Sequence, residues 1–161
     1  MSDQSPPIYF VVPVWGEAYV NLFTEISPPA QLSPGNIPAL LNLARCQYHI
    51  YTTQNDYATV YQSKAFQMLG TLINASIHVI DPQNSSSDRY VKKSEVYRAA
   101  IRRAVQDNAA NFFLNADIVL ADGFVRRVAE LLAAGKRVIE LPGPRTVKEA
   151  DLPCFIGPVL A

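Results

Sequence analysis

Several groups of polar residues have the types and spacing that ligand chemistry requires, and the sharpest is Asn115-Ala116-Asp117. It follows directly after the apolar run Phe112-Phe113-Leu114, which reads as a buried strand. A carboxylate at a strand end suits a hard divalent cation such as Mg²⁺ or Mn²⁺, which takes one or two carboxylates together with diphosphate oxygens and water. The alternative is that Asp117 only caps the turn or helix that follows. The three-residue pattern leaves both readings open.

A second group follows the first apolar run, Ile8–Val14. Trp15 is the only tryptophan of the chain, and its indole could stack on a base or pack as a partly buried side chain. Glu17 could hydrogen-bond a ribose, but a negative charge at this position also favours the start of a helix. We favour the helix role for Glu17.

A basic stretch forms the third group, with Arg89, Lys92, Lys93, Arg98, Arg102 and Arg103. Lys92 and Lys93 precede an expected helix whose N-terminus would itself favour an anion, so they are candidates to contact a diphosphate. The arginines further along are expected on the solvated face of that helix.

The remaining polar candidates favour structural roles. His49 and His78 fall inside expected strands, and together with Cys46 and Cys154 they lack the spacing of zinc ligands. Asp122 is expected to cap the helix that follows it. The sequence has no glycine-rich phosphate loop, no nucleophile elbow and no His-Glu-x-x-His motif.

A sheet must bring these candidates together, and its strands are predicted from apolar or β-rich runs at Ile8–Val14, Gln47–Thr53, Ile77–Ile80, Asn111–Leu114 and Arg137–Leu141. Helical spacing of apolar residues predicts helices at Tyr19–Ile26, Tyr57–Leu69, Val96–Val105 and Phe124–Leu132. The alternation predicts an α/β fold, an open three-layer α/β/α arrangement around a mostly parallel sheet. Ligands bind at the carboxyl ends of the strands in such sheets, where the candidate residues lie.

Helix boundaries are predicted from capping residues. Asn55 or Asp56 is expected to begin the second helix, Ser94 the third, and Gly135 is expected to follow the last turn of the fourth. The proline-rich segment Ser27–Pro38 is expected to be a loop or a broken helix.

Composition points to one folded domain spanning residues 1–161, with an irregular C-terminal tail over 142–161. The 161 residues are 49% hydrophobic and 17% charged, and 14 basic residues balance 14 acidic ones. A neutral balance gives no reason to expect a nucleic acid polymer as partner. The sequence contains no signal peptide and no apolar run long enough for a transmembrane segment, so a cytoplasmic location is expected.

In order and spacing, Ile8–Glu17, Ser94–Asp117 and Asp117–Gly135 resemble the N-terminal nucleotide-binding half of a GT-A glycosyltransferase, in the nucleotide-diphospho-sugar transferase superfamily. The resemblance covers roughly residues 8–141. It implies a Rossmann-like GT-A half with strand order 3-2-1-4, and a nucleotide-diphosphate sugar as ligand. It also implies metal-dependent transfer of a hexose to an unknown acceptor, with Mg²⁺ or Mn²⁺ as cofactor.

The resemblance also implies roles for individual residues. Pro13, Val14, Trp15 and Glu17 would line the nucleoside pocket, and Thr52 or Thr53 lies where the family often has an acid that contacts the base or ribose. Lys93 is expected to contact the diphosphate. Asp117 would be the last acid of the family's Asp-x-Asp motif and the metal ligand, with Asn115 in place of the first acid.

The sequence departs from the family at Asn115 and at the Thr-Thr pair, and about twenty residues remain after the expected fifth strand. The family's acceptor region normally follows that strand. A compact acceptor site, a partner, or a missing C-terminal region would account for the difference. The alternatives to an enzyme are a non-catalytic GT-A-like binding or assembly module, and a generic doubly wound domain in the order 2-1-3-4-5 with an unrelated ligand.

Overall fold

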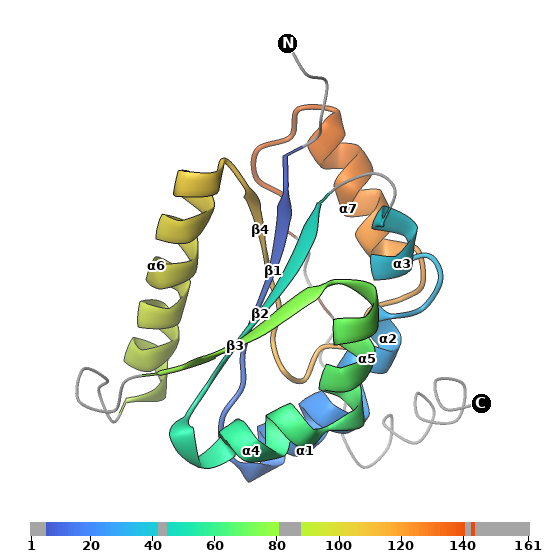
Figure 1. Cartoon of the computed structure of the whole chain (residues 1–161). Helices are drawn as coiled ribbons and strands as arrows, with labels where there is room; N and C mark the ends of the chain where they lie inside the picture. The colour runs from blue at the N-terminus through green and yellow to red at the C-terminus, as the bar shows by residue number, and fades with distance from the viewer. Residues whose placement is uncertain (1–5, 42–44, 81–87, 141–142, 144–161) are drawn as a thin grey trace.

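The computed structural model describes residues 6–41, 45–80, 88–140 and 143 (Figure 1). In chain order the elements are β1 (Ile8–Pro13), α1 (Glu17–Glu25), α2 (Ser27–Gln31), α3 (Ile37–Leu40), β2 (Cys46–Thr52), α4 (Gln54–Gln62), α5 (Lys64–Leu72), β3 (Asn74–Val79), α6 (Arg89–Asp107), β4 (Ala110–Phe113) and α7 (Phe124–Ala133). Four strands form one parallel sheet in the order β3-β2-β1-β4. The predicted α/β class and strand order are confirmed.

Strand β1 lies inside the sheet and is buried along its whole length, as its continuous apolar sequence predicts. Phe10 and Val12 face a core that also holds apolar side chains of α1, α3, α4, α5 and α7. Tyr9 and Val11 face the opposite side, where they pack with Val96, Ala100 and Ala104 of α6. The sheet therefore has helices on both faces, with α6 alone on one of them (Figure 1).

Strand β4 lies at the edge of the sheet, contrary to the expectation of a buried strand there. Its residues are only partly buried, and Phe113 is 40% exposed. The run at Arg137–Leu141, predicted as a fifth strand, forms none over the described residues 137–140, where Val138 is 79% exposed. β-branched residues alone do not make a strand when the backbone gains no paired neighbour. Leu141 and the expected tail at 142–161, apart from Gly143, lie outside the described residues.

The helix predicted over Tyr57–Leu69 is two helices, because Ser63 is extended and its hydroxyl accepts a hydrogen bond from the backbone N–H of Phe66 at 3.2 Å. The cap of α4 is Thr53 rather than Asn55 or Asp56. The Thr53 hydroxyl donates to the Asp56 carboxylate at 2.7 Å, so Asp56 supports the first turn from within the helix.

Helix α6 is longer than predicted, at 19 residues. Its N-cap is Asp88, whose carboxylate accepts hydrogen bonds from the backbone N–H groups of Tyr90 and Val91 at 2.7 and 3.4 Å. Ser94, the predicted cap, lies inside the helix and donates its hydroxyl proton to the carbonyl of Tyr90. The correction places Lys93 on the second turn of a helix rather than before one.

The segment after α1 is a broken helix, one of its two predicted forms, and its loop packs closely against the start of α7. Asp122 does not cap α7, since Gly123 occupies the N-cap position. Instead the Asp122 carboxylate accepts a hydrogen bond from the Gly35 N–H at 2.6 Å. Gly135 follows the last turn of α7 with a φ of 82°, as predicted. Within the described ranges, no helix is long and apolar enough to cross a membrane.

Replacing Gly35 with alanine is expected to destabilise the protein. A Cβ atom there would lie 2.6 Å from the backbone nitrogen of Gly123 and 2.7 Å from the Asp122 carboxylate. Such overpacking typically costs about 1–3 kcal/mol. Gly70→Ala in α5 is the matched control, because a Cβ at Gly70 meets nothing within 4 Å and alanine should stabilise that helix by about 0.5–1 kcal/mol. Urea unfolding measures both, and a Gly35→Ala protein as stable as the parent would contradict this packing.

Candidate functional site

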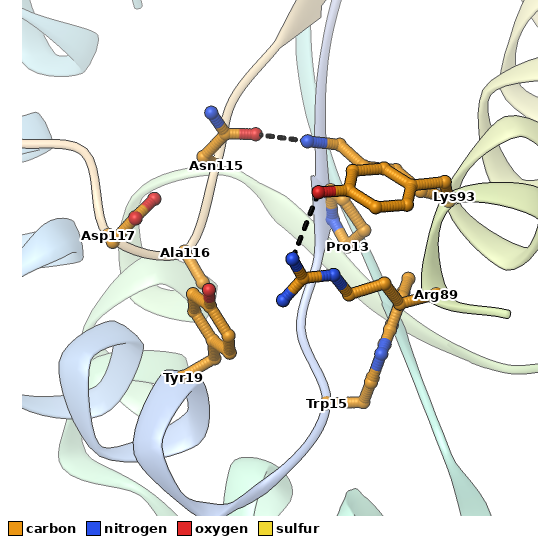
Figure 2. Close-up of a pocket in the computed structure, with 9 residues that line it drawn as sticks. Pro13, Trp15, Tyr19, Arg89, Lys93, Asn115, Ala116 and Asp117 are labelled. Carbon is orange, nitrogen blue, oxygen red and sulfur yellow. Dashed lines mark hydrogen bonds between the residues drawn. The ribbon is translucent and has the colours of Figure 1, made fainter.

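A hollow of about 220 Å³ lies at the carboxyl end of the sheet (Figure 2). It is lined by Pro13, Trp15, Tyr19, Arg89, Tyr90, Lys93, Asn115, Ala116 and Asp117. The chain leaves β1 toward β2 and β3, and α6 then returns it to β4 on the other side of β1. The crevice between the ends of β1 and β4 is therefore the topological switch point, where open α/β sheets bind ligands.

The wall after β4 is built by alternation of buried and exposed side chains. Leu114 and Ala116 are 1% and 3% exposed and belong to the core, whereas Asn115 and Asp117 are exposed. The Leu114 N–H donates to the Val11 carbonyl at 2.9 Å, which holds the chain against β1 beyond the end of the strand. The chain then turns, with the Ile118 N–H donating to the Asn115 carbonyl at 3.3 Å. With Leu114 and Ala116 packed into the core, the side chains of Asn115 and Asp117 are left exposed.

Helix α6 brings positive charge to the hollow. The Lys93 ammonium donates a hydrogen bond to Asn115 Oδ1 at 2.7 Å, and the Arg89 guanidinium donates to the Tyr90 hydroxyl at 2.9 Å (Figure 2). Both partners are neutral, so neither contact offsets the charge of the cation. Two positive side chains thus stand opposite the single negative charge of Asp117, an arrangement that attracts anions.

The loop from β1 to α1 supplies the aromatic wall. Trp15 is partly buried and lies 5.8 Å below the Lys92 ammonium, measured to the ring centroid. Tyr19 is 45% exposed. The loop is fixed at Gly16, which has a φ of 81° and donates its N–H to the Asp56 carboxylate at 3.0 Å. This left-handed conformation favours glycine, which explains the Trp-Gly sequence at the turn.

Five of the predicted site residues line the hollow: Pro13, Trp15, Lys93, Asn115 and Asp117. They come from the end of β1 and the loop after it, from α6 and from the segment after β4, which are far apart in the sequence. The structure therefore brings together the two segments on which the sequence argument depended, the first strand with its loop and the Asn-Ala-Asp motif.

Four predicted site residues lie elsewhere. Val14 is fully buried in the core, and Glu17 is exposed in the first turn of α1, where its charge suits the helix N-terminus. Thr52 is buried at the end of β2, and its hydroxyl has no hydrogen-bond partner among the described residues. Thr53 caps α4. The second strand thus adds no side chain to this hollow.

The Asp117 side chain is exposed and accepts no hydrogen bond from the residues that the structure describes. The capping alternative therefore has no contact to support it. In Figure 2 the Asp117 carboxylate lies beside the Asn115 and Ala116 backbone, at the outer side of the hollow. An exposed carboxylate without a hydrogen-bond partner of this kind is free to ligate a cation.

Residues that the sequence argument did not assign to the site are Tyr19, Arg89, Tyr90 and Ala116. The sequence placed Tyr19 only at the start of a predicted helix, and Arg89 only in a general basic stretch. The available signal is Asp88, because aspartate is a preferred N-cap residue. A helix that begins after Asp88 has Arg89 and Tyr90 in its first turn, one turn before Lys93. Ala116 gives no chemical signal of its own.

Comparisons with protein-family models, curated proteins and solved structures found no match to this chain. What the hollow can bind therefore depends on its own residues and on its place at the switch point of the sheet.

The Asp122 carboxylate, which holds the β4–α7 connection against Gly35, should make stability depend on pH. The N–H of Gly35, the hydroxyl of Ser33 and the N–H of Gly123 lower its pKa below the ordinary value of 3.8. A lowered folded-state pKa stabilises the protein above the unfolded-state pKa, and this stabilisation is lost as the pH falls through the folded-state value. The stability difference between the parent and Asp122→Asn should thus shrink below pH 3.8. Urea unfolding at stepped pH measures it, and a constant difference down to the lowest pH would contradict the assignment.

Proposed function

We propose that the hollow binds a nucleotide-diphosphate sugar together with Mg²⁺ or Mn²⁺, and that the chain transfers the sugar to an acceptor. The observation that carries the proposal is that the Asp117 carboxylate, the cations Arg89 and Lys93, and the Trp15 indole line one hollow at the switch point between β1 and β4. The strand order and the segments that resemble a GT-A nucleotide-binding half support the same ligand.

The proposed roles follow from charge and shape. Arg89 and Lys93 hold oxygens of the diphosphate, because both are cations that line the hollow and whose hydrogen-bond partners, Tyr90 and Asn115, are neutral. Trp15 provides an aromatic face for the base. The hollow, at about 220 Å³, is smaller than the roughly 300–1,000 Å³ of most small-molecule sites. Only part of the nucleotide-diphosphate sugar is therefore expected to fit inside the hollow. The rest is expected to lie over the exposed side chains of Tyr19 and Tyr90.

Asp117 fits a metal of the magnesium type. The described residues contain no group of three or more His, Cys, Asp or Glu side chains that could hold an ion. Mg²⁺ is commonly bound by one or two carboxylates while phosphate oxygens and water complete its shell. Asp117 would supply the carboxylate. The metal, when bound, would offset the negative charge of the nucleoside diphosphate as this group leaves the sugar.

A non-catalytic binding module is the second candidate. Of the described residues around the hollow, Asp117 is the one carboxylate, and the proposal assigns it to the metal. The base that accepts the acceptor's proton would then come from outside this set. An assay for donor hydrolysis or sugar transfer by the whole chain separates the two candidates, since only the enzyme releases nucleoside diphosphate.

Calorimetric titration with UDP- and GDP-sugars, with and without Mn²⁺, tests the proposed ligand. Binding to the parent chain should need Mn²⁺, and Asp117→Asn should weaken it by at least about tenfold, or 1.4 kcal/mol, through loss of a metal ligand. Glu25→Gln on the exposed surface of α1 is the matched control and should bind as the parent does. Absence of binding to every donor, or equal binding by Asp117→Asn, would refute the proposal.

Asn115→Asp should raise the affinity for Mn²⁺, because a second carboxylate would then line the same hollow as Asp117. The expected gain is roughly tenfold in the presence of donor. Asn115→Leu, which removes the Lys93 contact and adds no charge, is the control. If both variants bind Mn²⁺ equally, the Asp117 side of the hollow is not the metal site.

A further inference from the structure

One part of the sheet face that carries α6 is polar rather than packed. Helix α6 covers β1 and β4, while the neighbouring stretch of β2 and β3 on that face lies open beside it (Figure 1). A hollow of about 530 Å³ lies there, lined by Pro7, Tyr9, Arg45, Gln47, His49, Asn74, Ser76, His78, Arg103 and Asp107. Half of these residues (Pro7, Tyr9, Arg45, Gln47 and Asn74) precede a strand or lie in its first two positions, so this hollow extends toward the end of the sheet opposite Asp117.

A tight cluster of polar atoms forms the floor of this polar hollow. His49 on β2 lies directly opposite Ser76 on β3, and His78 follows two residues later on the same face. His49 Nδ1 lies 3.1 Å from His78 Nε2, and Ser76 Oγ lies 3.0 and 3.2 Å from the same two nitrogens. From α6, Arg103 Nη1 lies 3.4 Å from both. Four side chains from three elements thus meet around one point.

The cluster leaves one buried polar atom without a partner. An arginine N–H can only donate, so a ring nitrogen paired with Arg103 accepts, whereas the 3.1 Å contact between the two rings needs a proton on one of its nitrogens. In either tautomer of His49, its Nε2 is buried and has no hydrogen-bond partner among the described residues. His49 is only 3% exposed, so water does not readily reach that nitrogen.

The charges around the cluster favour an anion. Burial lowers the pKa of His49 to about 4, helped by His78 and Arg103, and burial followed by Arg103 lowers the pKa of His78. Both rings are therefore neutral near pH 7. Asp107, the carboxylate of the hollow, already accepts the Tyr9 hydroxyl at 2.7 Å. The Arg103 guanidinium forms no ion pair with a carboxylate of the described residues and faces two neutral rings instead.

We propose that this hollow is a binding site for a small oxyanion, a phosphate or carboxylate group, held by Arg103 together with the Ser76 hydroxyl and the ring proton that lies between His49 and His78. Arg103 is exposed on α6, so its fork can turn from the rings to a ligand. A transition metal is the competing occupant, since two imidazole nitrogens and an oxygen surround the point. The guanidinium beside them opposes a cation. This inference does not rest on the function proposed for the Asp117 hollow.

Nuclear magnetic resonance of the histidine rings tests the site directly. The chain has only two histidines, so every imidazole signal reports on this cluster. Titration of the whole chain with inorganic phosphate, and separately with acetate, should shift both ring systems saturably. The two arms distinguish a phosphate ligand from a carboxylate ligand.

Variants of α6 complete the test. Arg103→Gln should weaken the phosphate-dependent shift by at least about tenfold, and Arg103→Lys should retain part of it because the charge remains. Arg102→Gln, the neighbouring exposed arginine, should behave as the parent does. Urea unfolding of each variant confirms that it is folded. No saturable shift with either anion, equal binding by Arg103→Gln, or Zn²⁺ binding at the rings that tightens in Arg103→Gln would overturn the proposal.

Discussion

The burial of β1 on both faces is the constraint on which the rest of the structure depends. All six of its residues are buried, and a fully buried large apolar side chain stabilises a fold by about 1.5–3 kcal/mol. A strand of this kind needs a paired strand on each side and a helical layer above and below. Those requirements give the inner position of β1, the helices of both layers, and the crevice beside Pro13 at its carboxyl end.

A buried amide holds the far wall of that crevice in place. Asn36 is fully buried, and its side-chain nitrogen donates to the carbonyls of Ala30 and Ala121 at 2.9 and 3.1 Å. Its side-chain oxygen accepts from the Val125 N–H at 3.0 Å. The loop between α2 and α3 is thereby tied to the start of α7, and the connection that carries Asp117 is held from its C-terminal end. Such a satisfied buried network is rigid, and removing it would leave several polar groups unpaired.

Much of the fold could be predicted from the sequence, because apolar runs and helical spacing of apolar residues indicate which faces of the strands and helices are buried. The buried strand β1 and the parallel sheet follow from these patterns, whereas the strand order was implied only by the family resemblance. The position of β4 at the sheet edge does not, since Phe112-Phe113-Leu114 has the same apolar character in either place. Nor does the loss of the fifth strand, because Val138 and Ile139 have β propensity whether or not a partner strand pairs with them.

The candidate site divides in the same way. Asn115 and Asp117 could be placed by their position directly after the apolar run Phe112-Phe113-Leu114, and Trp15 by its position after the first strand. That Tyr19 and Tyr90 line the hollow depends on how α1 and α6 are placed relative to the carboxyl end of the sheet. No local sequence pattern indicates that placement. Thr52 and Thr53 were expected at the site only by the resemblance, and in the structure they serve the core and a helix cap. The glycosyltransferase resemblance itself stays a prediction.

Paramagnetic broadening by Mn²⁺ tests the central claim, that the crevice between β1 and β4 is the donor and metal site. The amide signals of the whole chain would be recorded with a nucleotide-diphosphate sugar and substoichiometric Mn²⁺. The account predicts that broadening is strongest around Asn115, Asp117 and Lys93 and is lost in Asp117→Asn. Broadening centred elsewhere, or unchanged in that variant, would contradict it.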